Sequence, residues 1–415
     1  MAGEDFTFRS ITDEEFAHFF TVGERAFGTQ ISQQDVERER GVFELDRTTG
    51  IFSGDTLVGT GGIFSLEMSV PGSLAPVAGV TFVTVSPTHR RRGLLTELMR
   101  RQLQGLHEAG REPVAALWAS ESAIYRRFGY GTASCFHEIR IDREGCAFDP
   151  LVVKNLPSLD YRLEPARDVV DELARIHDAG LVVRPGDFRR DERWWTYRLS
   201  QGESRPGSGW TAPLAVLATI PGSDVGRGYA LYRTKAAFTD LLPTGEVEIL
   251  EIVGDSAEVR LALWRQVLDL DLMHSWRAWV AVDDPLHVAL ADPRRARPRL
   301  SDNLWVRVVD VGRALTARRY ALDIDMVLSV HDDFCPWNTG HWHLIGGPDG
   351  AECRRTDKAA DIELPAWALG AVYLGSGSLY ALARAGNVVE RSKGALARAA
   401  AAFTWPVAAF CPMVF

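Results

Sequence analysis

Three consecutive arginines, Arg90–Arg92, stand between a strand-like segment and a helix-like segment of the chain. Residues Val80–Val85 are rich in β-branched side chains and stop at Pro87, and an amphipathic stretch follows Gly93. The first turn of a helix has backbone N–H groups without partners, and the helix dipole favours negative charge there. A bare arginine triplet is usually a solvated patch, but this position between strand and helix favours a pyrophosphate site.

The length and composition limit the class of protein. A chain of 415 residues is too long for one core, which predicts two or three domains. The net charge of −9 argues against a general nucleic-acid binder and mildly favours a cationic substrate. The five cysteines lack metal-ligand spacing, so we expect reduced thiols, no metal and a cytoplasmic location. No apolar run is long enough to predict a signal peptide or a membrane span.

The elements around the arginine turn form a mixed α/β pattern in the first unit. We expect a helix from Leu94 to Gly110, because apolar residues recur there every three or four positions and glycine suits the end of a helix. A short helix at 120–128 would have Ser120 as its N-cap. The other expected elements are a helix at 13–27 and strands near 50–52, 57–64, 78–85, 114–118 and 133–141, the last of which closes the unit.

The second unit, after a linker at 149–159, repeats this order of paired strands followed by a strand that leads into a helix. Its junction, Glu251–Glu258, has no arginine triplet, and Gly254 stands in an acidic setting. We therefore expect a repeated fold that has lost its phosphate site. The expected elements are helices at 169–179 and 257–268 and strands near 214–220, 228–234 and 246–253.

The third unit, from about residue 299, combines strand and helix patterns and ends in an apolar tail. The tail Thr404–Phe415 is uncharged and rich in large apolar side chains. Chain ends usually fray, but this composition favours docking of the tail on the protein. The expected elements are strands at 305–310, 326–330 and 342–345 and helical segments at 365–373, 379–385 and 396–403.

Two motifs resemble a known superfamily. Arg90-x-x-Gly93 after a Val-rich strand is similar to the acetyl-coenzyme A loop of the GNAT N-acetyltransferases, although Leu95 stands where Gly or Ala is usual. The segment Ser122–Tyr130 resembles the Tyr-x-x-x-Gly-Phe signature of the same superfamily, and it follows in the right order.

Over its whole length the chain resembles the Eis-type ("enhanced intracellular survival") acetyltransferases. Segments such as Pro336–Gly340 and Tyr373–Gly377 resemble the sterol-carrier-like domain of that family. The resemblance implies an α/β (α+β) fold with two tandem GNAT-like domains, the second degenerate, followed by a sterol-carrier-protein-like α+β domain. The implied boundaries are 1–148, 149–295 and 296–415.

The resemblance also implies site residues and a reaction. Acetyl would pass directly from acetyl-CoA to an amine, with Tyr125 as the acid and the Phe415 carboxylate as the base. A phenol of pKa about 10 can protonate a departing thiolate of pKa about 8.5. Packing on the sheet is the alternative for Tyr125, and a place in the core is the alternative for Phe82. The implied coenzyme contacts are Val83, Thr84, Val85, Arg90, Arg91, Arg92, Gly93, Leu94, Leu95, Thr96, Ser120 and Glu121, and the implied acceptor contacts are Phe82 and Phe415.

The acceptor implied by the resemblance is a cationic amine, such as several amines of an aminoglycoside. In the region expected to hold it, Asp35, Glu37 and Glu39 offer negative charge or form a solvated helix face. The family implies a homohexamer, with neither nucleic acid nor membrane as a partner. A protein Nε-lysine acetyltransferase and a non-catalytic lipid- or acyl-binding carrier are the alternatives.

Overall fold

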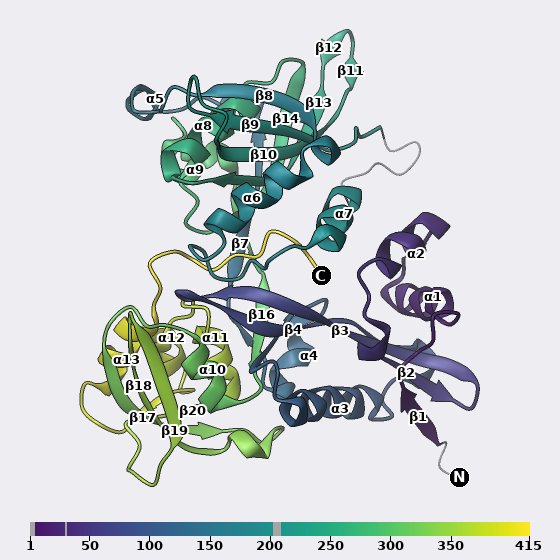
Figure 1. The fold of residues 1–415 in the computed structure, drawn as a ribbon, viewed down its shortest axis with the longest axis vertical. Coiled ribbons are helices and arrows are strands. Elements are labelled where there is room, and N and C mark those ends of the chain that lie inside the picture. Colours follow the sequence, from purple (N-terminus) through teal and green to yellow (C-terminus); the bar gives the residue numbers. More distant parts are fainter. Residues whose placement is uncertain (1–4, 30, 202–208) are drawn as a thin grey trace. The chain divides into compact units, whose positions relative to one another are not determined.

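The computed structural model describes residues 5–29, 31–201 and 209–415 (Figure 1). Residues 1–4, at the end where no signal peptide was expected, and Gln30, in the expected acceptor region, lie outside the described residues, as do residues 202–208. The chain forms two compact units. The first unit comprises residues 1–134, 304–406 and 414–415, and the second comprises residues 135–303 and 407–413.

The first unit contains a seven-stranded sheet in the order β1-β2-β3-β4-β5-β16-β6. Helix α3 packs its apolar stripe against β4 and β5, and it ends at Gly110, whose left-handed φ of 62° suits glycine. The expected helix at this position is therefore confirmed. The elements are β1 (Phe6–Arg9), α1 (Phe16–Phe27), α2 (Gln33–Arg40), β2 (Thr48–Ser53), β3 (Thr56–Val70), β4 (Ser73–Val85), α3 (Leu94–Ala109), β5 (Val114–Trp118), α4 (Ser122–Tyr125), β6 (Gly131–Thr132) and β16 (Leu304–Val308).

A second, five-stranded sheet in the first unit has the order β19-β18-β17-β20-β21. It belongs to the part of the chain that is expected to resemble sterol carrier proteins, together with four helices. Its elements are α10 (Val311–Ala317), β17 (Ile324–His331), β18 (Gly340–Gly347), β19 (Gly350–Arg355), β20 (Ile362–Pro365), α11 (Ala366–Val372), α12 (Leu379–Arg384), β21 (Val389–Glu390) and α13 (Ala395–Phe403).

The second unit contains a seven-stranded sheet in the order β15-β7-β14-β13-β10-β9-β8. Helix α8 packs on this sheet, and its bounds agree with the expected helix at 257–268. The elements are β7 (Cys135–Asp142), α5 (Pro150–Lys154), β8 (Asp160–Pro165), α6 (Val170–Gly180), α7 (Glu192–Gln201), β9 (Leu214–Thr219), β10 (Gly226–Lys235), β11 (Phe238–Thr239), β12 (Leu242–Pro243), β13 (Gly245–Gly254), α8 (Ala257–Leu268), β14 (Met273–Ala281), α9 (Leu286–Ala289) and β15 (Arg299–Asp302).

The two seven-stranded sheets exchange one strand each. Strand β7, which follows the first unit's own strands, pairs with β14 in the second sheet. Strand β16, which follows the second unit's own strands, pairs with β5 in the first sheet, from Leu304 opposite Trp118 to Val308 opposite Val114. The expectation that the strand at 133–141 closes the first unit is therefore wrong. The linker expected at 149–159 also differs, because α5 forms within it with Asp149 as its cap.

Candidate active site

The arginine turn connects β4 to α3. Arg91 has a left-handed φ of 62° and Gly93 one of 81°. Turns with left-handed residues are typical of backbone segments whose N–H groups bind anions. Gly93 is the N-cap of α3, and no side chain caps the first turn of the helix. The three arginines are exposed around it. The turn thus combines amide donors with positive charge, as a diphosphate requires.

Strand β4 carries a bulge immediately before this turn. Thr81 pairs with Gly62 of β3, whereas Thr84 pairs with Thr60, so one extra residue of β4 is inserted between these two pairs. Phe82 lies in this bulge with a φ of 55°, a conformation that is rare for an aromatic residue. The Thr60 hydroxyl donates to the Phe82 carbonyl at 2.8 Å and holds the bulge in place. Strained backbone of this kind is concentrated at functional sites.

Beyond the bulge, the edge of β4 that faces β5 is open. In the described ladder the parallel pairs between β4 and β5 run only from Val77 to Gly79. Residues Val83, Thr84 and Val85 continue β4 past the last of these pairs. A strand whose neighbour has separated offers backbone donors and acceptors to a bound chain. These are the three residues expected to contact the pantetheine arm.

Tyr125 lies on α4 and is buried in the core cluster that also contains Val80, with Val83 and Leu95 packed against this cluster. Its ring meets that of Tyr130 edge-on, with centroids 5.8 Å apart. Burial, with a smaller contribution from the negative charge of Glu121, raises the pKa of Tyr125 to about 12. At neutral pH the phenol therefore holds its proton and is able to donate it.

Phe415 is buried, with 6% of its side chain exposed. A β-carbon added to Gly79 would lie 3.2 Å from the Cδ2 atom of Phe415, so the ring lies against that glycine. Gly79 forms the last parallel pair between β4 and β5. The last residue of the chain is therefore docked at the point where these two strands begin to separate, and it does not fray.

The remaining expected coenzyme contacts lie in the first turn of α3 and just before α4. Leu94 is buried, and Leu95 and Thr96 are partly buried at the start of α3. Ser120 and Glu121 are exposed before α4. The expectation that Ser120 caps this helix is wrong, because Glu121 is the N-cap and makes no side-chain capping bond.

Phe82 is half-buried at the centre of an aromatic cluster from α1 and the segment after α2. Its ring stacks on Phe20 at 5.1 Å and meets Phe43 edge-on at 5.8 Å. Phe19 and Phe27 also contact it, at 5.5 and 6.0 Å. The apolar spacing of helix 13–27 was visible in the sequence. The contact of Phe82 with these apolar side chains was not visible in the sequence, because it depends on the bulge.

Helix α2 uses one of the three acidic residues expected near the acceptor for its own structure. Asp35 is buried, and it accepts a bond from the Ser32 backbone at 2.9 Å in a reciprocal capping box. Its second oxygen pairs with Arg38 at 2.9 Å. Burial alone would raise the pKa of Asp35, but the bonds from Ser32 and the charge of Arg38 lower it. Asp35 thus stabilises the helix from a buried position, so the solvated helix face that was the alternative for this residue is wrong.

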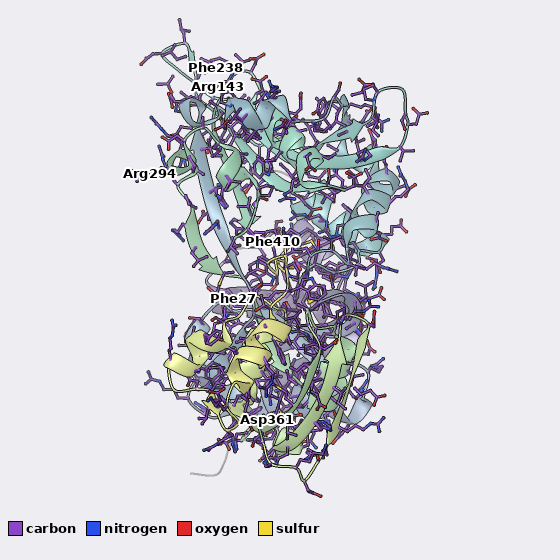
Figure 2. The ribbon with its side chains drawn as sticks, turned by 90° about the vertical axis from the view of Figure 1, so that its left-hand side faces the viewer. Phe27, Arg143, Phe238, Arg294, Asp361 and Phe410 are labelled. Atoms are coloured by element: carbon purple, nitrogen blue, oxygen red, sulfur yellow. The ribbon has the colours of Figure 1, made fainter. Side chains whose placement is uncertain are left out.

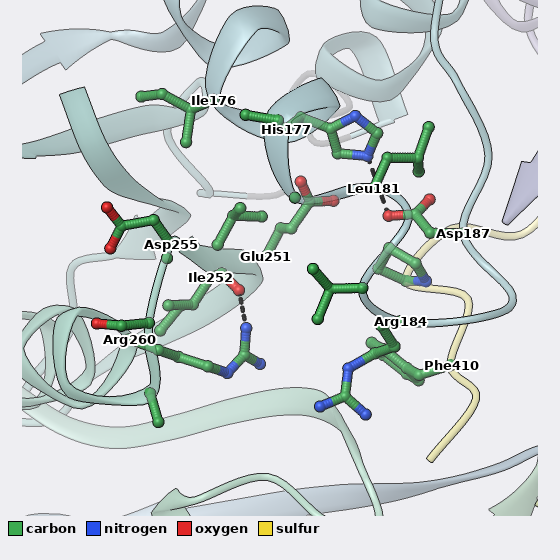
Figure 3. A pocket seen from close by; sticks show the side chains of 18 of the residues that line it. Ile176, His177, Leu181, Arg184, Asp187, Glu251, Ile252, Asp255, Arg260 and Phe410 are labelled. Atoms are coloured by element: carbon green, nitrogen blue, oxygen red, sulfur yellow. Dashed lines mark hydrogen bonds and ion pairs between the residues drawn. The ribbon is translucent and has the colours of Figure 1, made fainter. Parts of the chain in front are cut away.

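The corresponding turn of the second unit, between β13 and α8, is closed. The Ser256 hydroxyl accepts from the Val259 amide at 3.3 Å and so occupies the first turn of α8. Asp255 pairs with Arg227. Arg260 turns back and donates to the Ile252 carbonyl (Figure 3). A capped helix and an acidic side chain replace the open cradle of the first unit, which explains the loss of the phosphate site that the sequence predicts.

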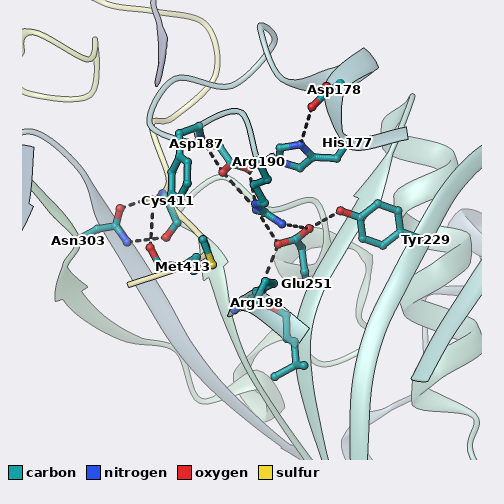
Figure 4. Close-up of polar contacts among 12 residues, drawn as sticks. His177, Asp178, Asp187, Arg190, Arg198, Tyr229, Glu251, Asn303, Cys411 and Met413 are labelled. Carbon is teal, nitrogen blue, oxygen red and sulfur yellow. Dashed lines mark hydrogen bonds and ion pairs between the residues drawn. The ribbon is translucent and has the colours of Figure 1, made fainter. Parts of the chain in front are cut away.

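A buried ionic network lies beside this turn in the second unit (Figure 4). Arg190 is paired with Asp187 at 3.2 Å and with Glu251 at 2.9 Å. His177 bonds to the same Asp187 at 3.0 Å, and the Tyr229 hydroxyl bonds to Glu251. Every charge of this group has a partner, as buried charges require.

The tail residues 407–413 pack in the second unit. Asn303 binds the backbone of Cys411 twice, accepting from its amide at 2.9 Å and donating to its carbonyl at 3.0 Å (Figure 4). The Phe410 amide donates to the Pro185 carbonyl at 2.8 Å. These backbone bonds hold Phe410 and Cys411 within the second unit.

Three family models match the chain. Acetyltransferase (GNAT) domain models match residues 7–133 and 186–308, and a sterol carrier protein domain model matches residues 311–412. The predicted fold of two GNAT domains followed by a sterol-carrier-like domain is confirmed.

Relatives match this chain over nearly its whole length. An uncharacterized N-acetyltransferase of Streptomyces avermitilis is 39% identical over 94% of this chain and 95% of its own. N-acetyltransferase Eis of Mycobacterium tuberculosis is 32% identical over 96% of both chains. This chain belongs to the Eis family. The crystal structure of Eis1 from Mycobacterium abscessus agrees, with a TM-score of 0.82 and 32% identity over 99% of this chain and 100% of that one.

Membership in the Eis family makes the protein an N-acetyltransferase, and its GNAT fold implies acetyl-CoA as the acetyl donor. Within the described ranges, no three His, Cys, Asp or Glu side chains gather as a metal site would require. No helix of the described chain is long and apolar enough to cross a bilayer.

Proposed function

We propose that this Eis-family acetyltransferase transfers acetyl to primary amines of a cationic acceptor, with Tyr125 as acid and the Phe415 carboxylate as base. One observation carries the proposal. The chain ends in a buried residue that lies against Gly79, where β4 and β5 separate. A terminal carboxylate at this opening is well placed to meet an amine that approaches the thioester.

The proton transfers balance in this scheme. The acceptor amine attacks the thioester carbonyl, a C–N bond forms, and the C–S bond breaks. The Phe415 carboxylate takes the proton that the amine loses, and the Tyr125 phenol gives its proton to the departing thiolate. The raised pKa of Tyr125, about 12, keeps the phenol protonated before the step, and solvent restores its proton afterwards.

The residues of the arginine turn would hold the diphosphate of acetyl-CoA through the amides near Gly93 and the charges of Arg90–Arg92. The peptide edge of Val83–Val85 would receive the pantetheine arm. We propose that the other expected contacts, Leu94, Leu95, Thr96, Ser120 and Glu121, also touch the coenzyme.

We also propose the chemical class of the acceptor. The chain carries a net charge of −9, which favours a polycation such as an aminoglycoside. Phe82, held in the bulge by Thr60, would form one wall of the acceptor pocket. We further propose the cytoplasmic hexamer that the family implies, with residues 1–148 as the catalytic domain, 149–295 as its degenerate copy and 296–415 as the sterol-carrier-like domain. Light scattering measures the oligomer.

Release of free thiol from acetyl-CoA in the presence of amines tests the reaction. Kanamycin, spermidine and a lysine-containing peptide serve as acceptors, and mass spectrometry counts the acetyl groups on each product. We expect the fastest release with kanamycin. Fast release with the peptide alone would favour protein acetylation, and no release above hydrolysis with any amine would exclude the proposal.

A further inference from the structure

A pocket of about 610 Å³ lies in the second unit, next to the closed turn (Figure 3). It is bounded by α6, the end of β13, the start of α8, β14 and the tail. In the first unit, β4, β5 and α3 correspond to β13, β14 and α8, and they form the proposed coenzyme site. The apolar part of the pocket wall includes Ile176, Leu181, Ile252, Trp264, Val280 and Phe410.

The pocket has the separated parallel strands of a coenzyme site but lacks the phosphate-binding turn. The parallel pairs between β13 and β14 end at Ile249 and Ala278 in the described ladder, so the two strands separate there as β4 and β5 do. The residues beyond these pairs line the pocket. The phosphate half is missing, because Ser256 caps α8 and Asp255 stands in the turn. The slot therefore suits a linear chain that carries no nucleotide.

The open edge of β13 offers donors to a ligand. Arg198 and Arg260 bind the carbonyls of Leu250 and Ile252, which places those carbonyls on the side of the strand away from β10. In a regular strand the N–H and C=O groups of one residue point to the same side, so the amide of Ile252, which pairs regularly with Ala230, also lies on that side. A backbone amide on this side can donate to a ligand, whereas the two carbonyls already accept from arginine side chains.

Arg184 brings charge to the same pocket. Its Nη1 atom donates to the Asp283 carboxylate at 2.6 Å and to the Ala408 carbonyl at 2.5 Å. These contacts within the described chain leave the Nε and Nη2 donors for a ligand. Arg184 and Arg260 both point into the pocket in Figure 3. Of the acidic residues in the wall, Glu251 and Asp187 are already paired with Arg190.

We propose that this pocket binds an apolar chain that ends in a carboxylate, of the fatty-acid class. The chain would lie in the slot between β13 and β14, and its carboxylate would accept from the Nε and Nη2 atoms of Arg184. A fork of two parallel N–H donors matches a carboxylate better than any other common anion of this size. This site is separate from the acetyl-transfer reaction, and its test requires no turnover.

Calorimetric titration with decanoate tests the proposal, with coenzyme A present in excess to fill the first unit. Decanol and decylamine have the same chain with no charge or with positive charge. We expect saturable binding of one decanoate per chain and at least about tenfold weaker binding of the other two, because a charge-assisted pair is lost.

Two variants locate the binding. Arg184→Gln should weaken decanoate binding about tenfold, whereas Arg193→Gln should leave it unchanged, because Arg193 pairs with Asp191 and does not line the pocket. Ala179→Trp adds a large side chain at an exposed position of the pocket wall and should abolish binding. Absence of saturable binding to the parent protein would overturn the proposal. Decanoate binding that both pocket variants retain, or decylamine binding of equal strength, would overturn it too.

Discussion

The docked chain end has two separable parts, an apolar ring that anchors it and a carboxylate that would act as the base. Phe415→Ala removes the anchor and keeps the carboxylate. Burial of a Phe side chain stabilises by about 2–3 kcal/mol, so the docked state should become about 30- to 150-fold less populated relative to the undocked state. One glycine added after Phe415 does the reverse, because it keeps the ring and moves the carboxylate by about 3.8 Å.

We expect the added glycine to lower kcat by about 100-fold or more, because the carboxylate leaves hydrogen-bond reach and general-base catalysis contributes about 10²- to 10⁴-fold. Phe415→Ala should lower kcat/KM about 10- to 100-fold. Neither variant should change the KM for acetyl-CoA more than about twofold, since the arginine turn is untouched. Steady-state thiol release with saturating amine measures both effects.

Val414→Ala is the matched control, because Val414 precedes the anchor and 40% of it is exposed. Its kinetics should stay close to those of the parent protein. Circular dichroism shows whether each variant is folded. If the glycine extension keeps the parent kcat, the carboxylate is not the base, and the reasoning from the docked tail fails.

Four further predictions concern other parts of the chain. Tyr125→Phe should lower kcat about 100-fold with little change in coenzyme affinity. In the parent protein, at pH values below about 11, the rate of thiol release should not fall through ionisation of this phenol, since burial raises the pKa of Tyr125 to about 12. Arg91→Gln should raise the KM for acetyl-CoA about tenfold, and added salt should weaken coenzyme binding less in this variant than in the parent protein. Asp332→Ala should lower the free energy of unfolding by about 3–5 kcal/mol in denaturant titrations, because it leaves the buried Arg307 charge, now paired at 2.7 Å, without its carboxylate. Burial alone would raise the pKa of Asp187, but its charged and hydrogen-bonded partners lower that pKa below the ordinary value. The contribution of Asp187 to the stability of the fold should therefore be complete above about pH 4 and be lost as the pH falls further. Tryptophan fluorescence during acid titration measures this loss.

The sequence predicts helices and local motifs well in this chain. The bounds of α8 and the end of α3 at Gly110 follow from apolar spacing and end residues, which are local signals. Helix α2 has little apolar character, with Val36 as its only buried apolar residue among those described, so no stripe reveals it. Strand pairing is a non-local property, and nothing in the segment around 133–141 distinguishes one sheet from the other.

The candidate site was predictable as a set of residues and less so as a shape. The turn at Gly93, the tyrosine at 125 and the apolar tail all carry local signatures. The bulge at Phe82 does not, because an extra residue in a strand becomes visible only in the pairing of β4 with β3. The second-unit pocket was missed for a related reason, since its opening depends on where β13 and β14 stop pairing.

The exchange of β7 and β16 bears on the order in which the protein can mature. The first sheet lacks an internal strand until residues Leu304–Val308 have been synthesised, so β5 leaves the ribosome with one edge uncovered. At about 5–20 residues per second, this exposure lasts on the order of 10–40 s. A fragment that ends near residue 150 would lack β16 and keep this edge of β5 exposed, so we expect it to be less stable than the whole chain. A variant in which β16 pairs weakly should therefore first show a greater need for chaperones during synthesis, before the activity of the finished protein falls.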